Sequence, residues 1–254
     1  MRLWAIALNT FKESVRNRIM LNILLFAVGL ILLSLVVGDW SLGHQVKVIK
    51  DFGLSAMSIF GLLIAVFIGI RMMVQEMEQR TIYLIASKPI NRWEIVVGKF
   101  TGLGITLAIN VFFMTLALGV VLLVIGATAD LFLLKAIWLI YLEILLIVAF
   151  SIFFSSFVSP TLGAVFTLVV FVIGHMSEFL NEYVKVYPDN GFHWLLKGAY
   201  HVIPNLEKLN LKMAAVGHLP LAPHAVLFGT LYGLAYIIFL LMITSAIFGR
   251  RDLK

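Results

Sequence analysis

The sequence of 254 residues contains no cysteine and few charged side chains. Without cysteine the chain can form neither a disulfide framework nor a thiolate metal site, and both of those protein classes are excluded. Charged residues make up 13% of the chain, whereas soluble domains carry about 25%. Because 62% of the residues are hydrophobic, a soluble fold could not hide the apolar surface, and we expect a membrane protein.

Motifs for nucleotide binding and hydrolysis are also missing. The pair Gly98-Lys99 does not complete a phosphate-binding P-loop, because Trp93 stands where the upstream glycine is required. The sequence contains no His-Glu-x-x-His pair and no Gly-x-Ser-x-Gly elbow. We therefore predict that the chain is not an enzyme, and that any ATP hydrolysis occurs in another subunit.

Long apolar segments dominate what is present. Each is close to or above the roughly 20 residues that cross a hydrocarbon core of about 30 Å. Because backbone groups in lipid must be satisfied within the segment, we expect helices rather than open strands. The predicted fold is an all-α integral membrane protein, a single polytopic domain over residues 1–254 with six transmembrane helices. The expected spans are 19–38, 52–75, 100–128, 136–157, 161–180 and 224–248.

The distribution of basic residues predicts the orientation. The net charge is +6, but the charges flank the apolar spans, which favours a topological role over nucleic-acid binding. Six spans place both termini on one side, and that side holds 12 of the 19 Lys and Arg residues, including every arginine. Basic residues concentrate in cytoplasmic loops. We expect a multi-pass protein of the plasma (inner) membrane with both termini cytoplasmic.

An amphipathic helix is expected before the first span. Trp4, Leu8, Phe11 and Val15 recur at helical spacing and form one apolar stripe, while charged residues occupy the other faces. This pattern is typical of a helix that lies in the inner interface. Two readings stay open: a simple anchor, or a connecting helix that contacts a cytoplasmic partner.

Residues 76–99 form the most prominent charged loop. The helix of the second span should continue past Glu76, break near residues 87–89, and resume at Asn91, which can act as a cap with Glu94 three residues later. A break followed by a short amphipathic helix suits a docking element. The alternative is a solvated loop whose charges only set the topology. On the opposite side, residues 181–223 combine prolines with aromatics, and we expect short helices at the outer interface there.

Two sets of ionisable residues lie in or near the spans. Glu143 is the only acidic residue deep in a span, where a carboxyl is costly and usually faces protein or water. It could contact a proton or cation in a pathway, or serve as a neutral carboxyl at a helix contact. His175, Glu178 and Glu182 share one helix face and are weak candidates for a divalent metal, so no metal site is assigned.

Rows of small residues predict close helix contacts. They are Gly61, Ala65 and Gly69 in the second span, Ser151, Ser155 and Ser159 near the end of the fourth, and Gly229 and Gly233 in the last.

The order of elements resembles the type 2 ATP-binding-cassette (ABC) transporter permeases. The resemblance covers the whole chain in topology and residues 76–99 in motif, where Glu76, Arg80-Thr81-Ile82, Lys88-Pro89, Arg92, Glu94 and Gly98-Lys99 follow the pattern of the NosY-like branch. It implies two permease subunits, as a homodimer or a pair of similar chains, each bound to a cytoplasmic ATPase through a coupling helix. ATP and magnesium would then bind to the ATPase, and this chain would bind no cofactor. The residues that would belong to the coupling region are Glu76, Arg80, Thr81, Pro89, Arg92 and Glu94.

The resemblance favours an ABC exporter permease, and two alternatives stay open. One is a membrane scaffold or force-transmitting subunit that acts on an outer partner without moving a substrate. The other is a stand-alone secondary transporter that uses Glu143, although such transporters usually show paired repeats, and none is found here.

Overall fold

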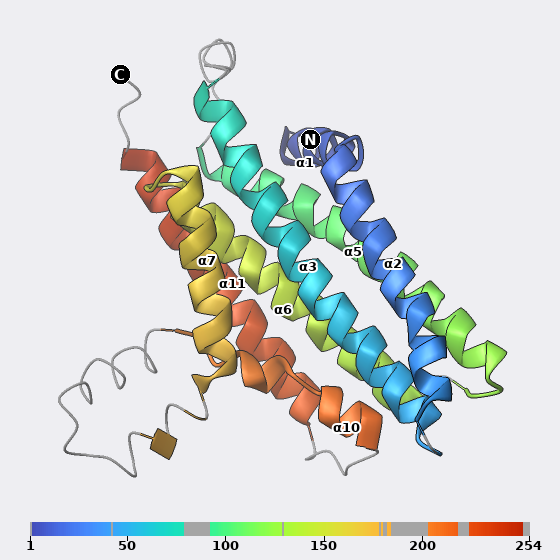
Figure 1. Cartoon of the computed structure of the whole chain (residues 1–254). Helices are drawn as coiled ribbons and strands as arrows, with labels where there is room; N and C mark the ends of the chain where they lie inside the picture. Colours follow the sequence, from blue (N-terminus) through green and yellow to red (C-terminus); the bar gives the residue numbers. More distant parts are fainter. Residues whose placement is uncertain are drawn as a thin grey trace.

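The computed structural model describes residues 2–41, 43–78, 92–128, 130–177, 179, 182–183, 203–217 and 224–250, with the backbone alone at 2, 71–78, 92 and 248–250. No strand occurs among these residues, and the elements form one elongated bundle of helices (Figure 1). In chain order the elements are α1 (Arg2–Val15), α2 (Arg18–Asp39), α3 (Gln45–Glu78), α5 (Arg92–Val124), α6 (Leu131–Ser155), α7 (Pro160–His175), η1 (Leu206–Leu209), α10 (Lys212–Gly217) and α11 (Ala225–Arg250).

Five of these helices are long and apolar enough to cross a membrane, which confirms an all-α integral membrane protein. They are α2, α3, α5, α6 and α11. The expected span at 161–180 is different, because its helix begins at Pro160 and ends at His175. Its 16 residues reach only about 24 Å at ~1.5 Å per residue, short of a ~30 Å core. Residues 177, 179, 182 and 183 are again helical, with undescribed residues between them, so the count of six spans stays a prediction.

The bundle has two distinct ends (Figure 1). At one end, called here the proximal end, lie α1, the last turns of α3, the first turns of α5 and the C-terminal turns of α11. At the distal end the chain turns between α2 and α3 and between α5 and α6. Gly43 (φ 82°) and Gly126 (φ 71°) adopt the left-handed conformation at these two turns, which glycine accommodates at little cost.

Helices α3 and α6 form the centre of the bundle, with most of their apolar windows buried. Gly61 and Gly69 of α3 leave room for two side chains of α6, Ile144 and Ser151, at positions where a Cβ atom would collide with them. Small residues at this spacing let two helix backbones approach closely. The close contact predicted for this row of small residues is confirmed.

Helix α1 lies across the first turns of α5 (Figure 1). Its buried face carries Ala7, Thr10 and Ser14, and it meets α5 at Gly98 and Gly102, where an added Cβ would strike side-chain or backbone atoms of α1. A second face carries the apolar stripe expected from the sequence, with Trp4, Leu8 and Val15 exposed. The helix therefore has an interfacial face and a separate face that packs on α5.

The described part of the segment between α7 and α11 packs into the bundle. Residues 203–217 contain η1 and α10, and Leu206 and Leu209 of η1 are fully buried. Leu206 approaches Gly174 near the end of α7, where a Cβ atom would lie 2.6 Å from its Cγ. Short helices were expected in this segment, and two are found. Helix η1 packs against α6, α7 and α11, and α10 packs against α3 and α6. Their expected place at the outer interface stays a prediction.

Candidate functional site

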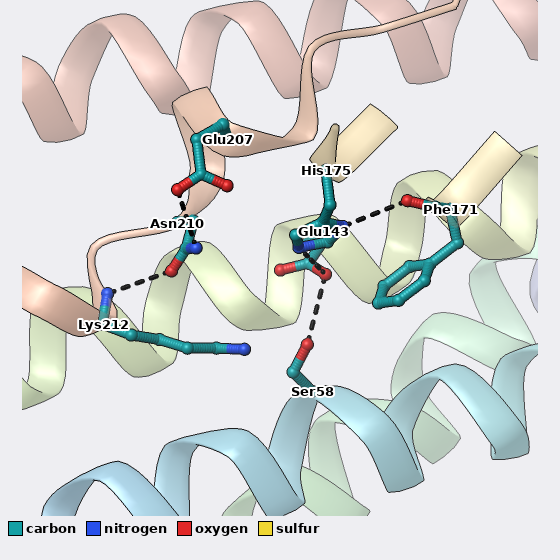
Figure 2. A network of polar contacts seen from close by, with 7 residues as sticks. All are labelled: Ser58, Glu143, Phe171, His175, Glu207, Asn210 and Lys212. Atoms are coloured by element: carbon teal, nitrogen blue, oxygen red, sulfur yellow. Dashed lines mark hydrogen bonds and ion pairs between the residues drawn. The ribbon is translucent and has the colours of Figure 1, made fainter. Parts of the chain in front are cut away.

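The most unusual buried group of the described chain is the carboxyl of Glu143. It lies at the midpoint of α6, with twelve residues of helix on either side, and only 1% of the side chain is exposed. Its position is about 18 Å along the helix axis from either end at ~1.5 Å per residue. Figure 2 shows the polar groups that gather around it from α3, α7 and the 203–217 segment.

Two neighbours contact the same carboxyl oxygen. The Ser58 hydroxyl of α3 donates to Glu143 Oε1 over 3.3 Å, and His175 Nε2 of α7 lies 3.4 Å from that oxygen. The second oxygen, Oε2, is buried and has no hydrogen-bond partner among the described residues. The carboxyl is thus only half satisfied, which is costly for a polar group removed from water.

His175 reaches the carboxyl because α7 stops there. The residue lies in the last turn of α7, and its Nδ1 is 3.1 Å from the backbone carbonyl oxygen of Phe171 (Figure 2). The imidazole ring also packs against the Phe171 ring, with 4.4 Å between centroids. These contacts fix the ring so that Nε2 faces Glu143.

The segment 203–217 supplies a second layer of charge. Asn210 Nδ2 donates to Glu207 over 3.0 Å, and the Lys212 backbone amide donates to Asn210 Oδ1 over 3.1 Å. The Lys212 side chain extends from α10 toward Ser58 (Figure 2). The cluster therefore contains two carboxyls, one lysine and one histidine drawn from four elements.

The residues expected to bind an ATPase are only partly described. Glu76 lies in the last turns of α3 and Arg92 is the first residue of α5, both as backbone only, and Glu94 is half-buried in the first turn of α5. Arg80, Thr81 and Pro89 lie outside the described residues. The helix expected to resume at Asn91 begins at Arg92 and runs without interruption to Val124, as predicted.

The weak metal candidates do not come together in what the structure describes. His175 is directed at Glu143, Glu182 is exposed, and Glu178 lies outside the described residues. Among the described residues, no group of three His, Cys, Asp or Glu side chains is arranged to hold a metal.

Two contacts were not foreseen from the sequence. The Glu143–His175 pair joins residues of different helices, and the spacing of His175 pointed instead to partners on its own helix. The fully buried Lys50 of α3 pairs with Asp130 at the start of α6 near the distal end. A buried lysine at the edge of a span requires a partner, so the need for an acidic neighbour was the only available signal.

Comparison with known protein families gives one match, and comparison with curated proteins gives none. The sequence pattern described as ABC-2 family transporter protein matches residues 4–253, which is nearly the whole chain. Members of this family are membrane permeases that pair with a cytoplasmic ABC ATPase. With its bundle of apolar helices, the chain belongs to the ABC-2 family of transporter proteins and is a permease subunit of an ABC transporter.

Proposed function

We propose that the chain is the membrane subunit of an ABC exporter that works as a pair of permease chains. Each permease would bind one ATPase subunit, which would hold ATP and magnesium. The proximal end would face the cytoplasm, with both termini there and the protein in the plasma (inner) membrane. The family match over residues 4–253 is the observation that carries this proposal.

The lengths of α3 and α5 support a docking site at the proximal end. The two helices have 34 and 33 residues, or about 50 Å each at ~1.5 Å per residue, well beyond a ~30 Å core. The apolar span of α3 ends at Ile70, eight residues before the helix ends at Glu78. The connection between α3 and α5 therefore begins outside the hydrocarbon core, where a soluble partner can reach it.

The contact of α1 with α5 offers a route by which movement at the docking site could reach α1. Gly98 and Gly102 bring the two helix backbones together within the first three turns after Arg92. A push at the start of α5 would consequently move α1 as well. This favours the connecting-helix reading of α1 over a simple anchor.

Arg92 tests the docking site. A guanidinium suits bidentate pairing with a carboxylate, and truncating one side of a desolvated charge pair commonly costs about 2–5 kcal/mol of binding. Arg92→Glu should leave the permease inserted and paired, yet strongly reduce recovery of the ATPase in a pull-down. The matched control is Lys47→Glu, the same charge reversal at an exposed site near the distal end.

Each outcome of the pull-down has a distinct meaning. Loss of ATPase with Arg92→Glu alone supports the docking site and the orientation. Equal recovery from all three proteins removes Arg92 from the interface, and loss with Lys47→Glu alone reverses the orientation. Recovery of no ATPase by the wild-type permease from its own cells would contradict the paired machine itself.

A transport assay can distinguish an exporter from a force-transmitting subunit. The packing of η1 against α7 and α11, and of α10 against α3 and α6, would also let the bundle act on an outer partner, so the scaffold alternative keeps a structural basis. Vesicles that contain the permease and its ATPase should accumulate or lose a substrate with ATP if the chain is an exporter. Full ATP hydrolysis with activation of an outer partner and no substrate movement would favour the scaffold. Placement in the NosY-like branch stays a prediction.

A further inference from the structure

We propose that Glu143 and His175 form an intramembrane proton-binding site at the point where α7 ends. Both groups belong to this chain, so the site would exist whether or not an ATPase is bound. It is built from side chains of two neighbouring helices and is closed by the 203–217 segment (Figure 2).

The hydrogen bonds of His175 require a proton between the two groups. A backbone carbonyl oxygen can only accept, so Nδ1, which lies 3.1 Å from the Phe171 oxygen, must carry hydrogen. Nε2 then faces Glu143 Oε1 over 3.4 Å. If His175 were neutral and Glu143 ionised, two lone pairs would face each other. One further proton, on either Nε2 or the carboxyl, turns that repulsion into attraction.

The carboxyl supports the same conclusion. Its Oε2 atom is buried and has no hydrogen-bond partner in the part of the chain that the structure describes, and the bond that Ser58 donates to Oε1 is long, at 3.3 Å. An ionised carboxylate at this depth is strongly disfavoured unless a counter-charge or a proton neutralises it. The nearest group able to provide either is the imidazole of His175.

The end of α7 adds a local field. The C-terminal end of a helix carries a partial negative charge that favours a cation in the last turn, where His175 lies. Helices that stop within the membrane use such ends to hold protons or small cations. The last turn of α7 lies beside the middle of α6, where Glu143 is placed.

The surrounding charges identify what would tune the site. Lys212 of α10 and Glu207 of η1 act on the Glu143 carboxyl from the distal side. The sequence places no charged residue in 52–70 of α3, 100–124 of α5 or 225–247 of α11. The position of the 203–217 segment is therefore the main variable: moving Lys212 toward Glu143 would favour the ionised carboxylate and release the proton.

Infrared difference spectroscopy of the full-length chain in lipid nanodiscs can test the site. Spectra would be recorded between about pH 5 and about pH 8, the range in which histidines titrate. The His175 and Glu143 contributions are obtained by subtracting His175→Gln and Glu143→Gln spectra from the wild type. Matched controls are His44→Gln and Glu13→Gln, since both residues are exposed and lie far from the site.

The expected result is one common midpoint for the carboxyl and imidazole bands of the wild type, because a single proton serves both groups. Glu143→Gln should remove the carboxyl change and move the imidazole midpoint, since the group that shares the proton is lost. The controls should leave both bands unchanged. Different midpoints for the carboxyl and imidazole bands of the wild type would overturn the proposal. So would an imidazole midpoint that Glu143→Gln leaves unchanged.

A milder variant covers the case in which these substitutions impair insertion. Ser58→Ala keeps both titrating groups and removes only the hydroxyl that favours the carboxylate. The two bands should then move together to higher pH, by roughly half a unit or more. Bands that separate, or that do not move, would contradict a shared site.

Discussion

Helices α6 and α7 follow each other in the chain and have similarly apolar sequences, yet they differ in length and in how deeply they are buried. Helix α6 has 25 residues and is buried over most of its length. Helix α7 has 16 residues, and most of its apolar side chains are exposed. The end of the short helix packs against η1, where Leu206 approaches Gly174.

The difference shows how a bundle can place ionisable groups at its centre. His175 is the last residue of α7 and faces Glu143 at the middle of α6. The 203–217 segment lies beside both residues (Figure 2). The polar site therefore forms where the last turn of α7, the middle of α6 and this later segment meet.

The largest effect is expected from removing the side chain that fills the space beyond α7. Leu206 is fully buried against Gly174, so Leu206→Ala should lower the free energy of unfolding by about 2–5 kcal/mol through the cavity that it leaves. The measurement is an unfolding titration of the purified chain in mixed micelles. Leu231→Ala, at an exposed position of α11, is the control and should cost far less. Equal losses would show that η1 does not stabilise the bundle.

A bulkier residue at Gly174 should have the next largest effect. A Cβ atom there would lie 2.6 Å from Leu206 Cγ and 3.0 Å from the Pro204 carbonyl oxygen, so Gly174→Val should displace η1. We expect a loss of about 1–3 kcal/mol in the same titration, as for other overpacked sites. Gly29→Val is the matched control, because nothing lies within 4 Å of a Cβ at Gly29. A stable Gly174→Val protein would place η1 elsewhere.

A third substitution extends the comparison to the proximal end. In α5, a Cβ at Gly102 would lie 2.5 Å from the Ala7 carbonyl oxygen, so Gly102→Val should push α1 away from α5. We expect about 1–2 kcal/mol of destabilisation and faster proteolysis of the N-terminal helix. Gly119→Val, where no atom lies within 4 Å, should leave α1 protected. If both variants are cleaved at the wild-type rate, α1 is not held by this contact.

The smallest effect is expected from a single hydrogen bond of the segment. The Asn205 backbone amide donates to the Tyr232 hydroxyl over 2.8 Å, and Tyr232→Phe would leave that amide unpaired. The expected loss is about 1 kcal/mol. Tyr236→Phe, one turn along the same helix, should be closer to neutral. A reversed order would show that Tyr232 does not fix the start of η1.

Much of this architecture was predictable, because it depends on patterns within single helices. Apolar length predicted the spans, and small residues at four-residue spacing predicted the contact at Gly61 and Gly69. The stripe that begins at Trp4 predicted the exposed face of α1. The second face of α1 was missed, because Gly98 was considered only as part of the Gly98-Lys99 pair and Gly102 was not considered.

The site itself could be predicted only in part. Depth within a span identified Glu143 as unusual. The contact of α7 with the later segment could not be predicted, since Gly174 and Leu206 are 32 residues apart in the sequence. For the same reason the spacing rule gave His175 the wrong neighbours: periodicity describes one helix, whereas the partner of His175 lies on another.

The central claim is that residues 203–217 pack inside the bundle, with Leu206 against Gly174 near the end of α7. The chain has no cysteine, so a pair can be introduced without background: Gly174→Cys with Leu206→Cys, whose Cβ atoms should lie at disulfide distance. Gly29→Cys with Leu206→Cys is the negative control. Mild oxidation in native membranes should cross-link the first pair rapidly and the control pair not at all. Failure of the first pair, while Gly61→Cys with Ile144→Cys cross-links between α3 and α6, would contradict the account.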